Sequence, residues 1–138
     1  MRPVLLDTNA YVAFKRGEAS VIEVIQYAEI IAMSPIVLGE LLSGFACGDN
    51  TKKNRDELQK LLQSSRVKLF SITSDTANFY SQIYSFLRNK GKPIPSNDMW
   101  IAAQALENGC VLYSYDKHFR EIEGLISGIS LSELIINS

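Results

Sequence analysis

The stretch Val4-Leu5-Leu6-Asp7-Thr8-Asn9 decides the fold, because it joins a short apolar run to three polar residues. A short apolar run bounded by Pro3 and by an acid is typical of a strand buried on both faces of a parallel sheet. The residue after such a strand lies at the carboxyl edge of the sheet, where open α/β sheets bind ligands. We therefore predict a central strand over residues 4–6, with Asp7 at a ligand-binding edge.

Other parts of the chain repeat this alternation of short apolar runs and helical patterns. The run Val111-Leu112-Tyr113 is followed by Asp116, as residues 4–6 are by Asp7. Strands alternating with helices predict an α/β fold with a mainly parallel sheet covered on both faces. The further strands expected are 30–33, 67–72 and an edge strand at 128–131. The helices expected are 8–17, a helix capped by Ser20, 35–46 with Ser34 as its cap, 51–64, 73–90 with Thr73 or Ser74 as its cap, and 96–108.

The length and composition fit one compact domain over residues 1–138. The chain is 46% hydrophobic and 21% charged, which is typical of a globular protein. No apolar stretch approaches the roughly 20 residues needed to cross a bilayer, and no signal-peptide pattern begins the chain, so we expect a cytoplasmic protein without a membrane partner. Cys47 and Cys110 are predicted to be buried free thiols, and with His118 they do not make a zinc site.

Four acidic residues stand where packing gives no reason for an acid: Asp7, Glu40, Asp98 and Asp116. Glu40 is the only charge between Ser34 and Gly48, on a helix that is apolar nearly all round and predicted to be buried. A buried carboxylate there needs either a remote partner or a bound cation.

Each of the other three acids also has a purely structural explanation. Asp7 can cap a helix, Asp98 can be stabilised by the helix dipole as a first-turn residue, and Asp116 can be a turn residue. Carboxylates gathered at one site repel unless a cation lies among them. An all-oxygen set favours Mg²⁺, with Mn²⁺ as the alternative, and such an ion can activate water for attack on a phosphodiester.

Four motifs in order make the chain resemble the PIN-domain family, and most of all the VapC ribonuclease toxins of VapBC toxin-antitoxin pairs. The resemblance covers nearly the whole chain and rests on residues 5–9, on Pro35 to Gly44 with Glu40, on Asn97 to Ala103, and on Leu112 to Phe119. It implies a PIN-like three-layer α/β/α sandwich with a mainly parallel central sheet.

The resemblance also implies a function. Asp7, Glu40, Asp98 and Asp116 would be the metal-binding catalytic acids of a Mg²⁺-dependent endoribonuclease. The polar residues Thr8, Asn9 and Ser114 would support them. Implied partners are an RNA substrate, a small antitoxin of the VapB type whose C-terminal part would occupy the active-site groove, and a second copy of the chain in a homodimer. Family members often carry a further acid after the fourth, where this chain has His118.

Basic residues recur beside the acids, although the net charge of the chain is −1. A nuclease must hold phosphates near its metal, so we predict that some of these side chains bind the RNA backbone; the alternative is a solvated charged surface. The candidates are Lys15, Arg16, Arg88, Lys90 and Lys92.

Two other functions are compatible with the sequence. A non-catalytic PIN-like module could bind RNA or protein while its acids only hold an ion. A phosphotransfer receiver could use Asp7 and Asp116, but it leaves Glu40 and Asp98 unexplained. Among the aromatic and polar neighbours, we expect Trp100 in the core and His118 at the surface rather than in a general-acid role.

Overall fold

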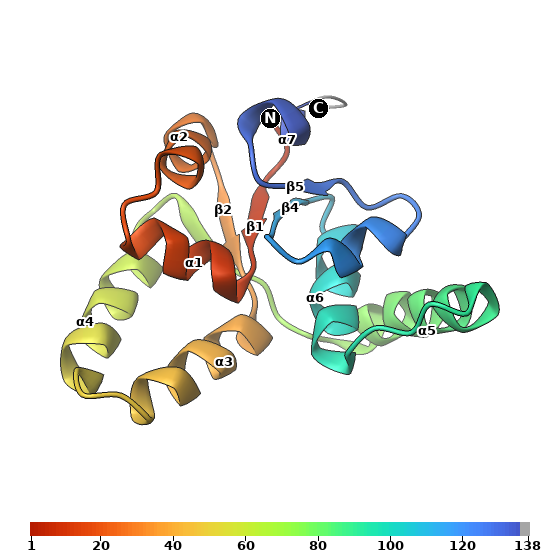
Figure 1. Ribbon diagram of the computed structural model, residues 1–138, viewed down its shortest axis with the longest axis horizontal. Coiled ribbons are helices and arrows are strands. Elements are labelled where there is room, and N and C mark those ends of the chain that lie inside the picture. Colours follow the sequence, from red (N-terminus) through yellow and green to blue (C-terminus); the bar gives the residue numbers. More distant parts are fainter. Residues whose placement is uncertain (136–138) are drawn as a thin grey trace.

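The computed structural model describes residues 1–135, which form a five-stranded sheet flanked by helices (Figure 1). The strands are β1 (Val4–Leu6), β2 (Ile31–Met33), β3 (Val67–Leu69), β4 (Val111–Tyr113) and β5 (Ser127–Gly128). The helices are α1 (Thr8–Lys15), α2 (Ala19–Tyr27), α3 (Pro35–Ala46), α4 (Thr51–Leu62), α5 (Ser74–Lys90), α6 (Ser96–Glu107) and α7 (Leu131–Ile135), with a 3₁₀ helix η1 (Lys117–Glu121).

The strands lie in the order β3-β2-β1-β4-β5, and all four neighbouring pairs are parallel. The chain moves outward from β1 to β2 and β3, and then returns across β1 to β4. This reversal makes the gap between the carboxyl ends of β1 and β4 a topological switch point, the place where doubly wound sheets bind ligands. The register pairs Leu6 with Tyr113, so the segments that follow both strands leave the sheet side by side.

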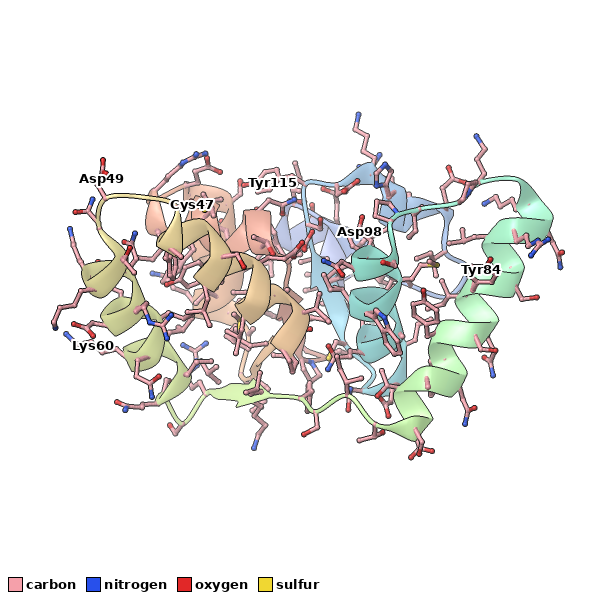
Figure 2. The ribbon with its side chains drawn as sticks, turned by 90° about the horizontal axis from the view of Figure 1, so that it is seen from below. Cys47, Asp49, Lys60, Tyr84, Asp98 and Tyr115 are labelled. Atoms are coloured by element: carbon pink, nitrogen blue, oxygen red, sulfur yellow. The ribbon has the colours of Figure 1, made fainter. Side chains whose placement is uncertain are left out.

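The helices separate into two layers, as the right-handed crossovers between parallel strands require. Helices α1 to α4 lie on one side of the sheet and α5 and α6 on the other (Figure 1). Both views place α4, which carries Lys60, and α5, which carries Tyr84, at opposite ends of the molecule (Figure 2). The predicted three-layer α/β/α sandwich is therefore confirmed.

The core follows the apolar runs that predicted the central strands. All residues of β1, β2 and β4 are buried. Helix α6 buries six residues, which are Met99 and the run from Ile101 to Ala105. Because β1 is covered on both faces, its position and the direction of Asp7 are fixed by packing rather than by the loop that follows.

Several local predictions are confirmed by hydrogen bonds at helix ends. Ser34 caps α3 by accepting from the Ile36 amide at 3.0 Å, with Pro35 at the first helical position. Thr73 caps α5 through a reciprocal capping box, and Gly91 ends that helix in the left-handed region with φ of 73°. Ser20 is not a cap, however, because α2 begins at Ala19 after Glu18, which makes no capping side-chain bond.

Other predictions were wrong in their extent. The strand expected at 67–72 ends at Leu69, at the half-exposed edge of the sheet, and the expected edge strand at 128–131 is only Ser127–Gly128. The chain turns instead into α7, where Glu133 accepts a hydrogen bond from the Ile129 amide at 3.3 Å. An edge strand of two residues carries too little periodicity to be located from sequence.

The apolar helix α3 is also less buried than predicted. Only Val37 and Leu41 of its residues are buried, because one side of the helix faces solvent rather than the sheet. Cys47, just after this helix, is exposed, whereas Cys110 is buried; both are free thiols. Trp100 is half-buried and stacks on Tyr80, with ring centroids 4.2 Å apart, instead of lying inside the core.

Across residues 1–135, none of the helices combines the length and apolar character that a membrane span requires.

Candidate active site at the carboxyl edge of the sheet

The switch point between β1 and β4 opens into a pocket of about 580 Å³. The four acids singled out from the sequence all line it. Asp7 follows β1, Glu40 comes from the middle of α3, Asp98 from the first turn of α6, and Asp116 from the segment after β4. The structure thus brings together four residues that span more than a hundred positions of the sequence.

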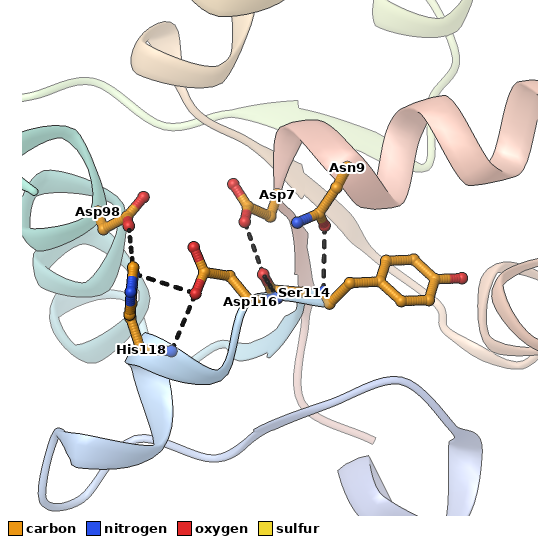
Figure 3. A network of polar contacts seen from close by, with 7 residues as sticks. Asp7, Asn9, Asp98, Ser114, Asp116 and His118 are labelled. Atoms are coloured by element: carbon orange, nitrogen blue, oxygen red, sulfur yellow. Dashed lines mark hydrogen bonds and ion pairs between the residues drawn. The ribbon is translucent and has the colours of Figure 1, made fainter. Parts of the chain in front are cut away.

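Asp7 forms the floor of this pocket and is held from two sides. Its backbone amide donates to the Tyr113 carbonyl at 3.0 Å, which continues the pairing of β1 with β4. Its Oδ1 accepts from the Thr8 amide at 2.8 Å, which caps α1, and its Oδ2 accepts from the Ser114 hydroxyl at 2.6 Å (Figure 3). Asp7 is therefore both a helix cap and a member of the pocket.

Burial makes the Asp7 charge costly. The residue is only 5% exposed, and this burial raises the pKa of its carboxyl group. The hydrogen bonds from Ser114 and from the Thr8 amide act in the opposite direction and lower the pKa, while the nearby charges of Asp98 and Glu40 raise it further. The fold therefore keeps a carboxylate that would be stabilised by a positive charge placed beside it.

Glu40 has a partner that the sequence did not identify. The Thr8 hydroxyl donates to Glu40 Oε1 at 2.6 Å and so links α1 to α3. Glu40 itself is half-buried, because α3 turns one side to solvent. The prediction that Glu40 is buried was therefore wrong. The prediction that it has a remote partner is confirmed, and that partner is Thr8.

Asp98 and Asp116 face each other across the outer part of the pocket, with His118 between them. His118 Nδ1 lies 3.4 Å from Asp98 Oδ2 and 3.0 Å from Asp116 Oδ1 (Figure 3). Burial raises the pKa of Asp98; the hydrogen bond with His118 lowers it, and the charge of Asp116 raises it. The side chains of Asp98 and Asp116 are 15% and 30% exposed, so this part is more open to water than Asp7.

The predicted polar supports take distinct positions. Ser114 donates to Asp7 and accepts from the Asp116 amide at 3.0 Å, so one hydroxyl connects two of the acids. Asn9 Oδ1 accepts from the Tyr115 amide at 3.1 Å and ties α1 to the segment after β4 (Figure 3). Together with the bond from Thr8 to Glu40, these contacts fix the backbone around the pocket.

Sequence reasoning missed Glu18, a further acid that lines the pocket. Its Oε2 accepts from the Tyr115 hydroxyl at 2.6 Å. Nothing in the sequence separates Glu18 from an ordinary charge in the turn after α1, since it follows Gly17 and belongs to no apolar run. Its place beside the pocket depends on how α1 and α2 pack, which is a tertiary property.

The five basic residues proposed to hold RNA are spread widely. Arg16 lines the pocket with the acids. Lys15 instead forms an ion pair with Glu57 of α4 at 2.5 Å, and Lys90 pairs with Glu121 at 2.9 Å. Arg88 lines a separate pocket with Tyr84 and Met99, and Lys92 is exposed in the turn before α6. Contact between any of them and RNA stays a prediction.

The donor set fits a hard divalent cation. Carboxylate oxygens supplied by four chain segments surround one open space, and oxygen ligands are those that Mg²⁺ and Mn²⁺ prefer. Desolvation and mutual repulsion act on Asp7 and Asp98 together, and a bound cation would relieve both. An isolated set of solvated surface acids would show neither the burial of Asp7 nor the shared hydrogen bonds.

Comparison with known proteins now places this geometry in a family. The model of the PIN domain matches residues 4–125, which include all four acids. The chain belongs to the PIN domain family. This PIN domain is 30% identical over 127 residues to ribonuclease VapC2 of Rickettsia felis, a match that covers 88% of the chain and 93% of that protein.

Solved structures give the same result. In the structure of VapBC2 from Rickettsia felis bound to a promoter DNA fragment, one chain matches this PIN domain with a TM-score of 0.81 at 27% identity, covering 91% of this chain and 97% of that one. A chain of VapBC-1 from nontypeable Haemophilus influenzae matches with a TM-score of 0.80 at 25% identity, covering 91% and 96%. The resemblance to VapC proteins inferred from the four motifs is confirmed.

Proposed function

We propose that this PIN domain is a divalent-cation-dependent endoribonuclease, with Mg²⁺ or Mn²⁺ as its cofactor, and the toxin of a type II toxin-antitoxin pair. The observation that carries the proposal is the convergence of Asp7, Glu40, Asp98 and Asp116 on one pocket at the switch point. Its similarity to ribonuclease VapC2 of Rickettsia felis supports RNA as the substrate.

The residues that line the pocket would have different roles in such a site. When bound, the cation would activate a water and stabilise the charge that develops on the phosphodiester oxygens. Asp7 would hold the cation from the pocket floor, because its two hydrogen bonds fix the carboxylate before any ligand arrives. Asp98 and Asp116 would hold it from the open side, where RNA must approach. Arg16, on the pocket wall, supplies a positive charge for a phosphate of the RNA backbone.

Glu40 and Thr8 have a positioning role in this proposal. The hydroxyl of Thr8 donates to Oε1 of Glu40, a residue that lines the pocket. Because Asp7 caps α1 and Thr8 is the first residue of that helix, a shift of α1 would move the two acids together. In other metal proteins, residues that hydrogen-bond to the metal ligands orient those ligands in the same way.

The proposal is tested by incubating the purified protein with total RNA and sequencing the fragment ends. We expect cleavage with Mg²⁺ or Mn²⁺, no cleavage with EDTA, and no cleavage by the Asp98→Asn protein. Equal cleavage by the Asp98→Asn protein in EDTA would reject the metal-dependent mechanism. A protein that binds RNA but never cuts it, with its acids intact, would instead support the non-catalytic module.

The charge of the pocket also suggests how an antitoxin would inhibit the enzyme. Five acids line the pocket against a single arginine: Asp7, Glu18, Glu40, Asp98 and Asp116, with Arg16. An arginine of a VapB-type antitoxin would bind these carboxylates through paired hydrogen bonds and take the position of the cation. The VapBC complexes among the structural relatives support such a partner.

This inhibition predicts competition between the antitoxin and the cation. Purification from the native host should recover a small partner, and titrating Mg²⁺ into the complex should weaken the binding of that partner. Asp7→Ala should weaken it as well. A partner whose affinity responds to neither change would reject this mode of inhibition and leave the nuclease proposal standing. We further propose a homodimer, which analytical ultracentrifugation of the free protein tests, and a location in the cytoplasm.

A further inference from the structure

His118 lies at the pocket rim in a position that the fold defines closely. It belongs to η1, whose next residue, Phe119, is fully buried and anchors the turn against the core. The backbone amide of His118 donates to Asp116 Oδ1 at 2.9 Å, so the acid also caps this turn. The backbone therefore holds the imidazole ring beside Asp116, although the His118 side chain is 52% exposed.

The spacing of three potential ligand atoms matches a coordination site. His118 Nδ1 lies 3.0 Å from Asp116 Oδ1 and 3.4 Å from Asp98 Oδ2, and the ligand atoms of the three residues all lie within 4.8 Å of one another. Two ligands at right angles around an ion that they bind at about 2.1 Å are separated by about 3.0 Å. The nitrogen and the two carboxylates could thus share one ion with little rearrangement.

We propose that His118 is itself a metal ligand, which with Asp98 and Asp116 makes a mixed nitrogen and oxygen site selective for a transition-metal cation such as Mn²⁺ over Mg²⁺. The inference rests on the proposed function, because it concerns the cation of that same pocket. Mg²⁺ is a hard ion that binds oxygen and keeps its waters, so an imidazole adds little to its affinity. First-row transition metals accept imidazole nitrogen readily, so His118 favours them.

The alternative is a simple ion pair, in which a protonated His118 faces two carboxylates without any metal. Both arrangements bring the same atoms within 3.0 to 3.4 Å. They differ in what happens when a cation is added. A ligand exchanges its contact with the acids for a bond from Nδ1 to the metal, whereas an ion-pair partner is displaced by the incoming positive charge and leaves the site.

The chain contains a single histidine, which makes the distinction measurable. Pulsed electron paramagnetic resonance of Mn²⁺ bound to the untagged protein detects ¹⁴N of a directly coordinated imidazole, and His118 is its only source here. We expect a strong nitrogen coupling in the wild-type protein and its loss in His118→Ala. Lys117→Ala, the neighbouring exposed residue of η1, is the matched control and should keep the coupling.

Titration calorimetry gives the second readout. His118→Ala should weaken Mn²⁺ binding by at least about tenfold, because a ligand is lost, and should change Mg²⁺ binding by less than about twofold. Bound Mn²⁺ without nitrogen coupling in the wild-type protein would overturn the role of His118 and leave the proposed nuclease intact. Failure of the wild-type protein to bind Mn²⁺ or Mg²⁺ at all, together with no RNA cleavage, would overturn both.

Discussion

The pocket has two parts that are built in different ways. The inner group, Asp7, Thr8 and Ser114, is fixed by hydrogen bonds among side chains and backbone amides directly after β1 and β4. The outer group, Asp98, Asp116 and His118, comes from the start of α6, from the segment after β4 and from η1, and is more exposed. The two groups meet through Ser114, which bonds to Asp7 and to the Asp116 amide.

The inner group is therefore preorganised by the fold, whereas the outer group is accessible to ligands. The inner group has its geometry set by the packed sheet, so the cost of burying the Asp7 charge is met during folding rather than during ligand binding. The outer group remains open to water, where a substrate or an inhibitor can reach it. Variants that remove a hydroxyl donor of the inner group, Thr8 or Ser114, should therefore damage both stability and activity, whereas variants of the outer group should damage activity with little loss of stability.

The largest effect on RNA cleavage is expected from replacing Asp7, the carboxylate of the inner group. Asp7→Asn keeps the shape of the side chain but removes its charge, so RNA cleavage should fall by about a thousandfold or more, as expected when several kcal/mol of metal-mediated stabilisation is lost. Single-turnover cleavage of a defined RNA measures the effect. Asp49→Asn, an exposed acid after α3 and remote from the pocket, is the control and should cleave normally (Figure 2).

Ser114→Ala tests the connection between the two groups. Asp7 and the Asp116 amide each lose a partner, so the free energy of unfolding should fall by about 1–3 kcal/mol. Cleavage should fall by about 10- to 100-fold, as for other residues that orient metal ligands. Urea denaturation and initial rates measure the two effects. Ser132→Ala, on the exposed side of α7, should change neither, and equal effects of both variants would remove the special role of Ser114.

Asp98→Asn tests the outer group through stability in EDTA. Burial raises the pKa of Asp98, so the ionised carboxyl destabilises the folded state at neutral pH, and the variant should be at least as stable as the wild type. The matched control is Asp75→Asn, an exposed acid in the first turn of α5, which should lose about 0.3–1 kcal/mol of helix-dipole stabilisation.

The same variant predicts a pH dependence. As the pH falls from 7 through the raised pKa toward the ordinary value of 3.8, the wild-type Asp98 takes up a proton in the folded state first. The stability advantage of Asp98→Asn over the wild type should therefore be greatest at neutral pH and shrink on acidification. Denaturation curves of both proteins between pH 4 and pH 7 measure it. An advantage that grows as the pH falls would contradict the assigned shift.

The smallest effect concerns Arg16, which lies beside both groups. Replacing Arg16 by glutamine should remove about one phosphate contact, so RNA binding should weaken and the slope of log affinity against log salt should fall by about one. Fluorescence anisotropy in a series of salt concentrations measures it. Lys52→Gln, an exposed residue of α4 that pairs with Asp56, should leave the slope unchanged.

The inner group was the part that sequence could predict. An apolar run followed by an acid locates both the strand and its edge, because burial on both faces leaves a pattern along the chain. This is why β1, β2, β4, Asp7 and Asp116 were placed correctly relative to the sheet. The caps at Ser34 and Thr73 were predicted for a similar reason, since the residues that form a cap are neighbours in sequence.

The contacts between elements could not be predicted. The bond from Thr8 to Glu40 and the position of Glu18 depend on how α1 packs against α3 and α2, and single sequences carry no signal for such pairs. The burial of α3 was overestimated because apolar composition does not show which faces other elements cover. The ion pairs of Lys15 and Lys90 likewise depend on distant residues of the chain.

In the proposed function, the four acids hold one or more divalent cations between the two groups. The most direct measurement is a crystal structure of the protein grown with Mn²⁺ and recorded at a wavelength where manganese scatters anomalously. We expect an anomalous peak inside the pocket, within bonding distance of carboxylate oxygens of Asp7 and Asp98. A fully ordered pocket without a peak at saturating Mn²⁺, or Mn²⁺ bound only elsewhere on the molecule, would contradict it.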